Sequence, residues 1–129
     1  MLQTFSTFRK GSNIAHRILV FASEVLRVAR ELPSDTAGKH IASQMMRSAT
    51  AVGANYEEAR AAESSPDFIH KVSIANKELR ESLWWLALID TSQLIPLNLE
   101  AIAREGSELA SILTASIRTA RKNLSDGSS

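Results

Sequence analysis

The sequence predicts an all-α protein, an antiparallel up-and-down four-helix bundle. Only five glycines and three prolines occur among its 129 residues, so the chain has few turn signals and room for long elements. Apolar residues recur at the helical spacings of three and four in four stretches, and no stretch alternates as a strand does. We expect a loose lead over residues 1–11, the bundle over residues 12–124 and a disordered tail over residues 125–129.

The first helix is expected to begin after Ser12 or Asn13, because both residue types make good N-caps. It should end at Leu32, because Pro33 disfavours helical backbone in the residue before it. The apolar positions of its inner stripe are Ile14, Ile18, Phe21, Val25, Val28 and Leu32.

The second helix, expected from caps at residues 34–36 to about Ala62, carries the most unusual stretch of the chain. Residues 41–56, IASQMMRSATAVGANY, contain one charged side chain, Arg47, and many small ones. A surface helix normally has a charged outer face, so this stretch should be covered on two sides. One cover is its own bundle, and we expect the second to be another copy of the chain. The positions assigned to this oligomer interface are Met46, Ala49, Gly53 and Tyr56.

The third helix should begin after Ser64, with Pro66 and Asp67 in its first turn, and run to about Asp90. Trp84 and Trp85 are adjacent, so their side chains point about 100° apart. One ring can enter the core, and the other must lie on the flank of the bundle or against a partner subunit. We favour the oligomer interface for this pair over an isolated surface tryptophan.

The fourth helix follows a break at Ile95-Pro96, and Asn98 is its expected cap. Its apolar positions again recur at three and four, which places them on one face of a helix. They are Leu99, Ile102, Gly106, Leu109, Leu113, Ile117, Ala120 and Leu124.

Composition excludes several classes of protein. The chain has no cysteine, so it forms no disulfide or thiolate metal site. It shows neither a secretory signal nor an apolar run of about 18 residues, so we expect a cytoplasmic protein without a membrane span. The net charge of +1 and pI near 8.2 are too balanced to indicate a nucleic-acid binder by themselves.

Three consecutive stretches resemble a known bacterial family of four-helix bundles, the 23S rRNA-intervening-sequence proteins. They are QMMRSATAVGANYEEAR (44–60), ESSPDFIHKVSIANKELRES (63–82) and LWWLALI (83–89). The second helix of that family reads approximately Arg-Ala, then Ser-Ile-x-x-Asn-Ile-Ala-Glu-Gly. The positions that match in order are Arg47, Ser48, Ala49, Val52, Asn55 and Glu58, whereas the positions that depart from the pattern are Tyr56, Glu57 and Ala59.

The resemblance implies a four-helix bundle that assembles as a ring, typically a homopentamer. The family is also similar to the accessory protein of diversity-generating retroelements, a basic pentameric barrel linked to reverse transcriptase and nucleic acid. The resemblance therefore implies RNA or DNA as a partner. The residues of the second helix independently predict a homo-oligomer, so the two lines of reasoning agree.

Polar residues on the covered second helix must find hydrogen-bond partners, because an unsatisfied buried group costs about 1 to 3 kcal/mol. We assign these residues to a structural polar network rather than to a catalytic site, since no nucleophile and base lie together: Arg47, Ser48, Asn55, Glu58 and Glu78. A di-metal site would need Glu-x-x-His on two helices, and only Asp67-x-x-His70 comes near this pattern. We therefore expect no enzyme activity, no metal and no cofactor.

An up-and-down bundle brings the start of the first helix and the end of the fourth helix to the same end. The basic residues expected to gather there as a nucleic-acid-binding rim are Arg9, Lys10, Arg17, Arg118, Arg121 and Lys122. A ring of copies would multiply this rim into a surface that holds phosphates. Two alternatives remain open at this point: an ordinary solvated surface, and a protein-interaction scaffold that binds no nucleic acid.

Overall fold

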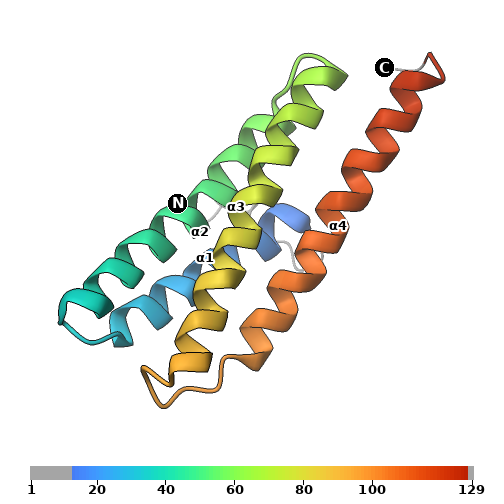
Figure 1. The fold of residues 1–129 in the computed structure, drawn as a ribbon. Helices are drawn as coiled ribbons and strands as arrows, with labels where there is room; N and C mark the ends of the chain where they lie inside the picture. The colour runs from blue at the N-terminus through green and yellow to red at the C-terminus, as the bar shows by residue number, and fades with distance from the viewer. Residues whose placement is uncertain (1–12, 128–129) are drawn as a thin grey trace.

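The computed structural model describes residues 13–127, and these contain four helices and no strand: α1 (Ile14–Glu31), α2 (Thr36–Arg60), α3 (Ser65–Ser92) and α4 (Glu100–Ser125). The helices run alternately up and down, with α2, α3 and α4 side by side and α1 behind them (Figure 1). Each helix packs on the next in the chain, and α1 closes the bundle by a weaker contact with α4. The predicted all-α up-and-down bundle is confirmed.

Side-chain caps define where three of the four helices begin. Asn13, Asp35 and Ser64 each accept a hydrogen bond from a backbone N–H two or three residues further on. At α4 the N-cap position is Leu99, which has no side-chain acceptor, and Asn98 instead accepts from the N–H of Glu100 at 2.9 Å. Asn98 therefore caps the beginning of α4, as expected, but it stands one position before the N-cap residue.

The core runs along the bundle axis and is built from the inner stripes of all four helices. Its largest fully buried apolar side chains are Ile18, Phe21, Met45, Leu79, Leu86, Ile89, Leu109 and Leu113. Gly106 lets α4 approach this core closely, because a Cβ there would lie 2.8 Å from the Phe21 ring and 2.6 Å from Leu83 Cδ2.

α1 is the shortest helix, and α4 continues well past its beginning. Arg17, in the first turn of α1, reaches Glu105 and Glu108 of α4. From that level α4 runs on to Ser125, a distance of about 25 Å at the helical rise. Among the described helices α4 contacts α3 and α1 but not α2, so this end of α4 has only α3 beside it, and Figure 1 shows it at the top of the view.

The outer face of α2 is open in the single chain, on the side where the prediction places a second copy. Ala49 was expected at an oligomer interface, but it is fully buried inside its own chain's core. The exposed positions Ser43, Met46, Thr50 and Ala54 form an outer stripe, so a single chain does leave one side of α2 open to water. That stripe itself carries no charge, as the sequence indicated.

The ends of the chain lie largely outside the described residues. The loose lead predicted over residues 1–11 lies outside that part, so the structure does not describe it. α4 continues through Ser125, with a turn at residues 126–127, so the helix extends one residue into the tail predicted from position 125. None of the described helices is long and apolar enough to cross a membrane.

Candidate functional site

A shallow groove runs along the outer seam of α3 and α4 and is lined by basic and small polar side chains. It consists of three adjoining hollows of about 290 to 360 Å³. No carboxylate is among the residues that line them. We call this surface the basic groove, and its lining residues are Ser73, Asn76, Lys77, Arg80, Ala110, Ser111, Thr114, Ala115, Ile117, Arg118 and Arg121.

The basic groove follows from helical spacing on two antiparallel helices. Its charged and polar members on α3 and α4 recur at intervals of three, four and seven residues, so each set lies on one face of its helix. The two faces are joined where the Asn76 side-chain N–H donates to Thr114 Oγ1 at 3.0 Å. Small residues at Ala110, Ser111 and Ala115 keep the floor of the groove low.

The four cations of the basic groove make no direct pair with an acidic side chain among the described residues, although the charge of Lys77 acts on Glu81. Lys77, Arg80, Arg118 and Arg121 form no ion pair with any described residue, whereas ion pairs elsewhere on the bundle engage Arg17, Arg27, Arg47, Arg60, Lys71 and Arg104. The groove therefore concentrates positive charge on a chain whose net charge is only +1. Asn76 Oδ1, at its centre, is a buried acceptor without a hydrogen-bond partner among the described residues.

The structure separates the basic rim predicted from the sequence into parts. Arg118 and Arg121 line the basic groove, and Lys122 is exposed beside them near the end of α4. Arg17 lies about 20 Å further down the bundle from Arg118, at the level of Glu105, and is paired with two carboxylates. The hydrogen bonds that Arg17 donates to Glu105 and, with a smaller effect, to Glu108 raise the pKa of Arg17, so its charge is balanced by carboxylates of the protein itself. Arg9 and Lys10 lie outside the described residues.

The predicted polar network is a set of separate pairs rather than one connected site. Arg47 bridges from α2 to both Glu78 and Glu81 of α3. The buried hydroxyls of Ser48 and Ser82 lie 2.8 Å apart. The two remaining members are bonded elsewhere, because Asn55 donates to the carbonyl of Ala51 and Glu58 accepts from Lys71. Each group has a partner, which is what a structural role requires.

The two tryptophans occupy different environments. Trp85 packs against the core, and its Nε1–H donates to Glu81 at 3.1 Å. That hydrogen bond, together with Arg47, lowers the pKa of Glu81. Trp84 is 58% exposed, more than any other large hydrophobic side chain among the described residues. Its ring meets Trp85 edge to face, with the ring centres 5.0 Å apart and the planes at 80°.

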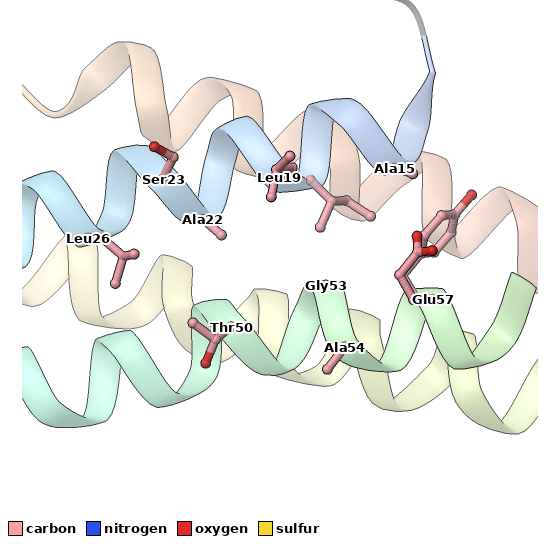
Figure 2. Close-up of a pocket in the computed structure, with 11 residues that line it drawn as sticks. Ala15, Leu19, Ala22, Ser23, Leu26, Thr50, Gly53, Ala54 and Glu57 are labelled. Carbon is pink, nitrogen blue, oxygen red and sulfur yellow. The ribbon is translucent and has the colours of Figure 1, made fainter. Parts of the chain in front are cut away.

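A second groove lies between α1 and α2 and is apolar. Figure 2 shows Leu19 and Leu26 of α1 opposite Thr50 and Ala54 of α2 across a hollow of about 370 Å³. We call it the apolar groove, and it is lined by Ala15, Ile18, Leu19, Ala22, Ser23, Leu26, Thr50, Gly53, Ala54, Tyr56 and Glu57. Two residues predicted at the oligomer interface, Gly53 and Tyr56, therefore face this groove.

The remaining predicted interface residues lie around the apolar groove or away from it. Met46 is 38% exposed and stands one helical turn before Thr50, so it extends the apolar surface along α2. Trp84 and Trp85 lie on α3, on another side of the bundle. Burial raises the pKa of Tyr56, whose hydroxyl stays neutral at physiological pH. Over the described residues, no group of three or more metal-ligating side chains comes together.

Known proteins share this architecture. The family model for the 23S rRNA-intervening sequence protein matches residues 10–115. The chain belongs to that family. A crystal structure of a protein of unknown function from the S23 ribosomal protein family of Bacteroides thetaiotaomicron is similar in fold, with a TM-score of 0.74 and 31% sequence identity. The match covers 81% of this chain and 95% of that one. No curated protein matches the chain.

Within this family member, sequence reasoning missed half of the basic groove. Lys77 and Arg80 were not assigned to any site, because they lie in the middle of α3 and the predicted rim lies at the end of the bundle. The signal that could have identified them is their spacing from each other and from Ser73 on one outer face of α3. The residues opposite them on α4 become evident only once the register of the two helices is known.

Proposed function

We propose that this protein is a non-enzymatic, ring-forming member of its family that binds RNA or DNA through phosphate contacts in the basic groove. The observation that carries the proposal is the set of four cations, Lys77, Arg80, Arg118 and Arg121, which form no ion pair within residues 13–127 and share a groove whose lining residues include no carboxylate. Such a surface attracts a polyanion and offers it little repulsion.

The side chains of the basic groove suit phosphate binding in two respects. Arginine presents a planar fork of N–H donors that can hold two phosphate oxygens at once, and three of the four cations are arginines. Ser73, Ser111 and Thr114 add hydroxyl groups, which commonly bind phosphate and sugar oxygens in nucleic-acid complexes. The contacts proposed here retain Arg118 and Arg121 from the predicted rim and add Lys77 and Arg80 to them.

We place self-association on the opposite side of the bundle, at the apolar groove. Because the helices pack in the cyclic order α1, α2, α3, α4, the seam between α1 and α2 lies across the bundle from the seam between α3 and α4. A copy of the chain that covers Leu19 and Met46 would remove exposed apolar surface and leave the basic groove free. A ring of copies, of which the family resemblance implies a pentamer, would repeat the basic groove around its circumference.

The absence of catalysis is also part of this proposal. The hydroxyl groups of the basic groove, on Ser73, Ser111 and Thr114, have no histidine or carboxylate among the other lining residues to activate them. A groove of this kind binds a phosphate chain without cleaving it.

Fluorescence anisotropy with labelled RNA and DNA of about 20 nucleotides tests the function, measured from about 50 to 200 mM salt. Phosphate binding predicts an affinity that falls steeply as salt increases. The variant that neutralises the groove replaces Lys77, Arg80, Arg118 and Arg121 by glutamine. It should lose at least about 100-fold in affinity at low salt and have a shallower salt dependence.

A matched control removes the same charge elsewhere on the described surface. It replaces Arg27, Arg30, Lys39 and Arg104, all exposed and outside the basic groove, by glutamine. Equal losses in the two variants would show that only overall charge matters and would contradict a site. No binding of the unaltered protein at about 50 mM salt would overturn the proposal and favour a protein-interaction scaffold.

A further inference from the structure

We propose that Trp84 is a platform on which an unpaired base stacks, so that the ligand of the basic groove is single-stranded at this point. This inference rests on the proposed function and names the form of nucleic acid that the groove takes. It depends on three features of the structure: the position of Trp84 relative to the groove, the support of its ring, and the neutralisation of the nearest carboxylate.

Trp84 stands in line with the cations of α3. Lys77 and Arg80 precede it by seven and four residues, and these spacings place all three side chains on one face of the helix. Arg80 lines the basic groove, so Trp84 lies one helical turn, about 5 Å, beyond the last cation. The next residues on this face of α3 are Ala87, Leu88 and Thr91; Leu88 packs against the core, and the indole of Trp84 stays 58% exposed.

The groove and the ring together are long enough to follow a strand. Asn76 and Thr114 fix the register of the two antiparallel helices. From that level, Arg121 lies seven residues along α4 in one direction and Trp84 lies eight residues along α3 in the other. The line from Arg121 to Trp84 is therefore about 20 Å long, with Arg118 and Arg80 between its ends.

The indole of Trp84 is held by a supported neighbour rather than standing alone. It meets the Trp85 ring edge to face at 5.0 Å. Trp85 is fixed in turn by its hydrogen bond to Glu81 and by an edge contact with His40 at 5.9 Å. A ring that is already oriented loses little conformational entropy when a base stacks on it, which favours binding.

The nearest carboxylate on this part of α3 does not oppose a phosphate chain. Glu81 is one turn from Trp84, and it accepts from Trp85 Nε1 and pairs with Arg47. Lys77 also lowers the pKa of Glu81 through its charge, after the larger effects of Trp85 and Arg47. The negative charge of Glu81 is thus compensated by groups of the protein itself.

An exposed aromatic ring beside a row of cations distinguishes single strands from duplexes. In a duplex the faces of the bases are stacked on each other, so only phosphates could reach the groove. In a single strand the base faces are free, and stacking on an aromatic side chain adds to the phosphate contacts. Stacking also tolerates any base, so the ligand defined by this geometry is an unpaired segment rather than a particular sequence.

The experiment compares Trp84→Ala and Trp84→Phe with the unaltered protein on single-stranded RNA, single-stranded DNA and duplexes of the same sequence. Trp84→Ala should weaken binding of single strands by roughly 5- to 150-fold and leave duplex binding unchanged. Trp84→Phe, which keeps a ring, should lose less. The salt dependence should stay as steep as before, because no phosphate contact is removed. The ratio of RNA to DNA affinity identifies which sugar the strand carries.

Two further measurements separate this inference from its alternatives. In Trp85→Phe, whose only tryptophan is Trp84, fluorescence should be quenched when a single strand binds. Leu97→Ala, which removes another exposed apolar side chain outside the grooves, should bind normally.

Salt-dependent binding that Trp84→Ala does not alter would overturn stacking and leave the proposed function intact. Equal weakening on duplexes and single strands would overturn it as well. Light scattering that shows a smaller assembly for Trp84→Ala would assign the ring to a contact between copies, which also contradicts the inference. Failure of all forms of nucleic acid to bind would overturn both proposals together.

Discussion

The apolar groove and the basic groove have the same architecture and opposite chemistry. Each lies between two consecutive antiparallel helices. The volumes are similar, about 370 Å³ for the apolar groove and about 360 Å³ for the largest hollow of the basic groove. The first is lined mainly by alanine, leucine and glycine, with one carboxylate, and the second by cations and hydroxyl groups. The bundle fold therefore sets where grooves occur, and the outward-facing residues set what each can bind.

The difference also explains how one small chain could both assemble and bind. Apolar surface gains free energy when another apolar surface covers it, roughly 25 cal/mol per Å². A cationic groove gains most from a mobile polyanion that releases counterions. Because the two grooves lie across the bundle from each other, the proposed assembly would not obstruct the proposed binding.

Charge reversal in the basic groove should have the largest effect. Replacing Arg80 and Arg118 by glutamate puts two carboxylates among the remaining cations, so affinity for nucleic acid should fall by at least about 100-fold at low salt. The mass in light scattering should be unchanged, because neither residue touches the apolar groove. A change of mass with unchanged affinity would invert the assignment of the two grooves.

A charge in the apolar groove should have the complementary effect. Leu19 is 48% exposed and lines this groove, so Leu19→Glu should fold normally but lose at least about 10-fold in association, because a carboxylate is costly to bury. Val20→Glu is the matched control, since Val20 is 42% exposed on the same helix but does not line the groove. Sedimentation or light scattering across a range of concentrations measures both. Equal behaviour of the two variants would contradict assembly through the apolar groove.

The sequence predicted the fold well because helix signals are local. The spacing of Ile18, Phe21 and Val25 places them in the core, and proline and the cap residues mark the helix ends. The family resemblance was likewise carried by a continuous segment. The same reasoning placed Met46 and Ala49 on one face of α2, but Ala49 is buried and Met46 is exposed. Of two residues three positions apart on a helix, one can be buried in the core while the other is exposed at its edge.

Pairing between helices could not be predicted in the same way. Arg17 was assigned to the rim because it is basic and near the start of α1, but Glu105 and Glu108 of α4 hold it. The ion pairs of Arg17 with these two glutamates depend on how far α4 extends past α1. That offset cannot be read from the sequence of either helix. The α3 half of the basic groove, with Lys77 and Arg80, was missed for the same reason, since Arg80 and Arg118 meet only through the register of α3 and α4.

The two helical glycines that face other helices contrast a closed contact with an open groove. Gly106 lies where α4 presses on the core, and a methyl group there would approach the Phe21 ring at 2.8 Å. Gly106→Ala should therefore destabilise the protein by about 1 kcal/mol or more, since overpacking exceeds the gain in helix propensity. Chemical denaturation monitored by circular dichroism measures the difference. An increase in stability would show that Phe21 and Leu83 yield easily and that this seam is loosely packed.

Gly53 gives the smallest expected effect and the sharpest test of the apolar groove. A methyl group at this position meets only Ile18 Cγ2, at 3.7 Å, an ordinary contact. Gly53→Ala should therefore raise the free energy of unfolding by about 0.5 to 1 kcal/mol through helix propensity. If a second copy fills the groove, the added methyl group should at the same time weaken association. The melting temperature should then rise at low protein concentration, where monomers dominate, and rise less at high concentration, where assembly contributes. A rise of equal size at every concentration would mean that nothing packs against Gly53 from another copy.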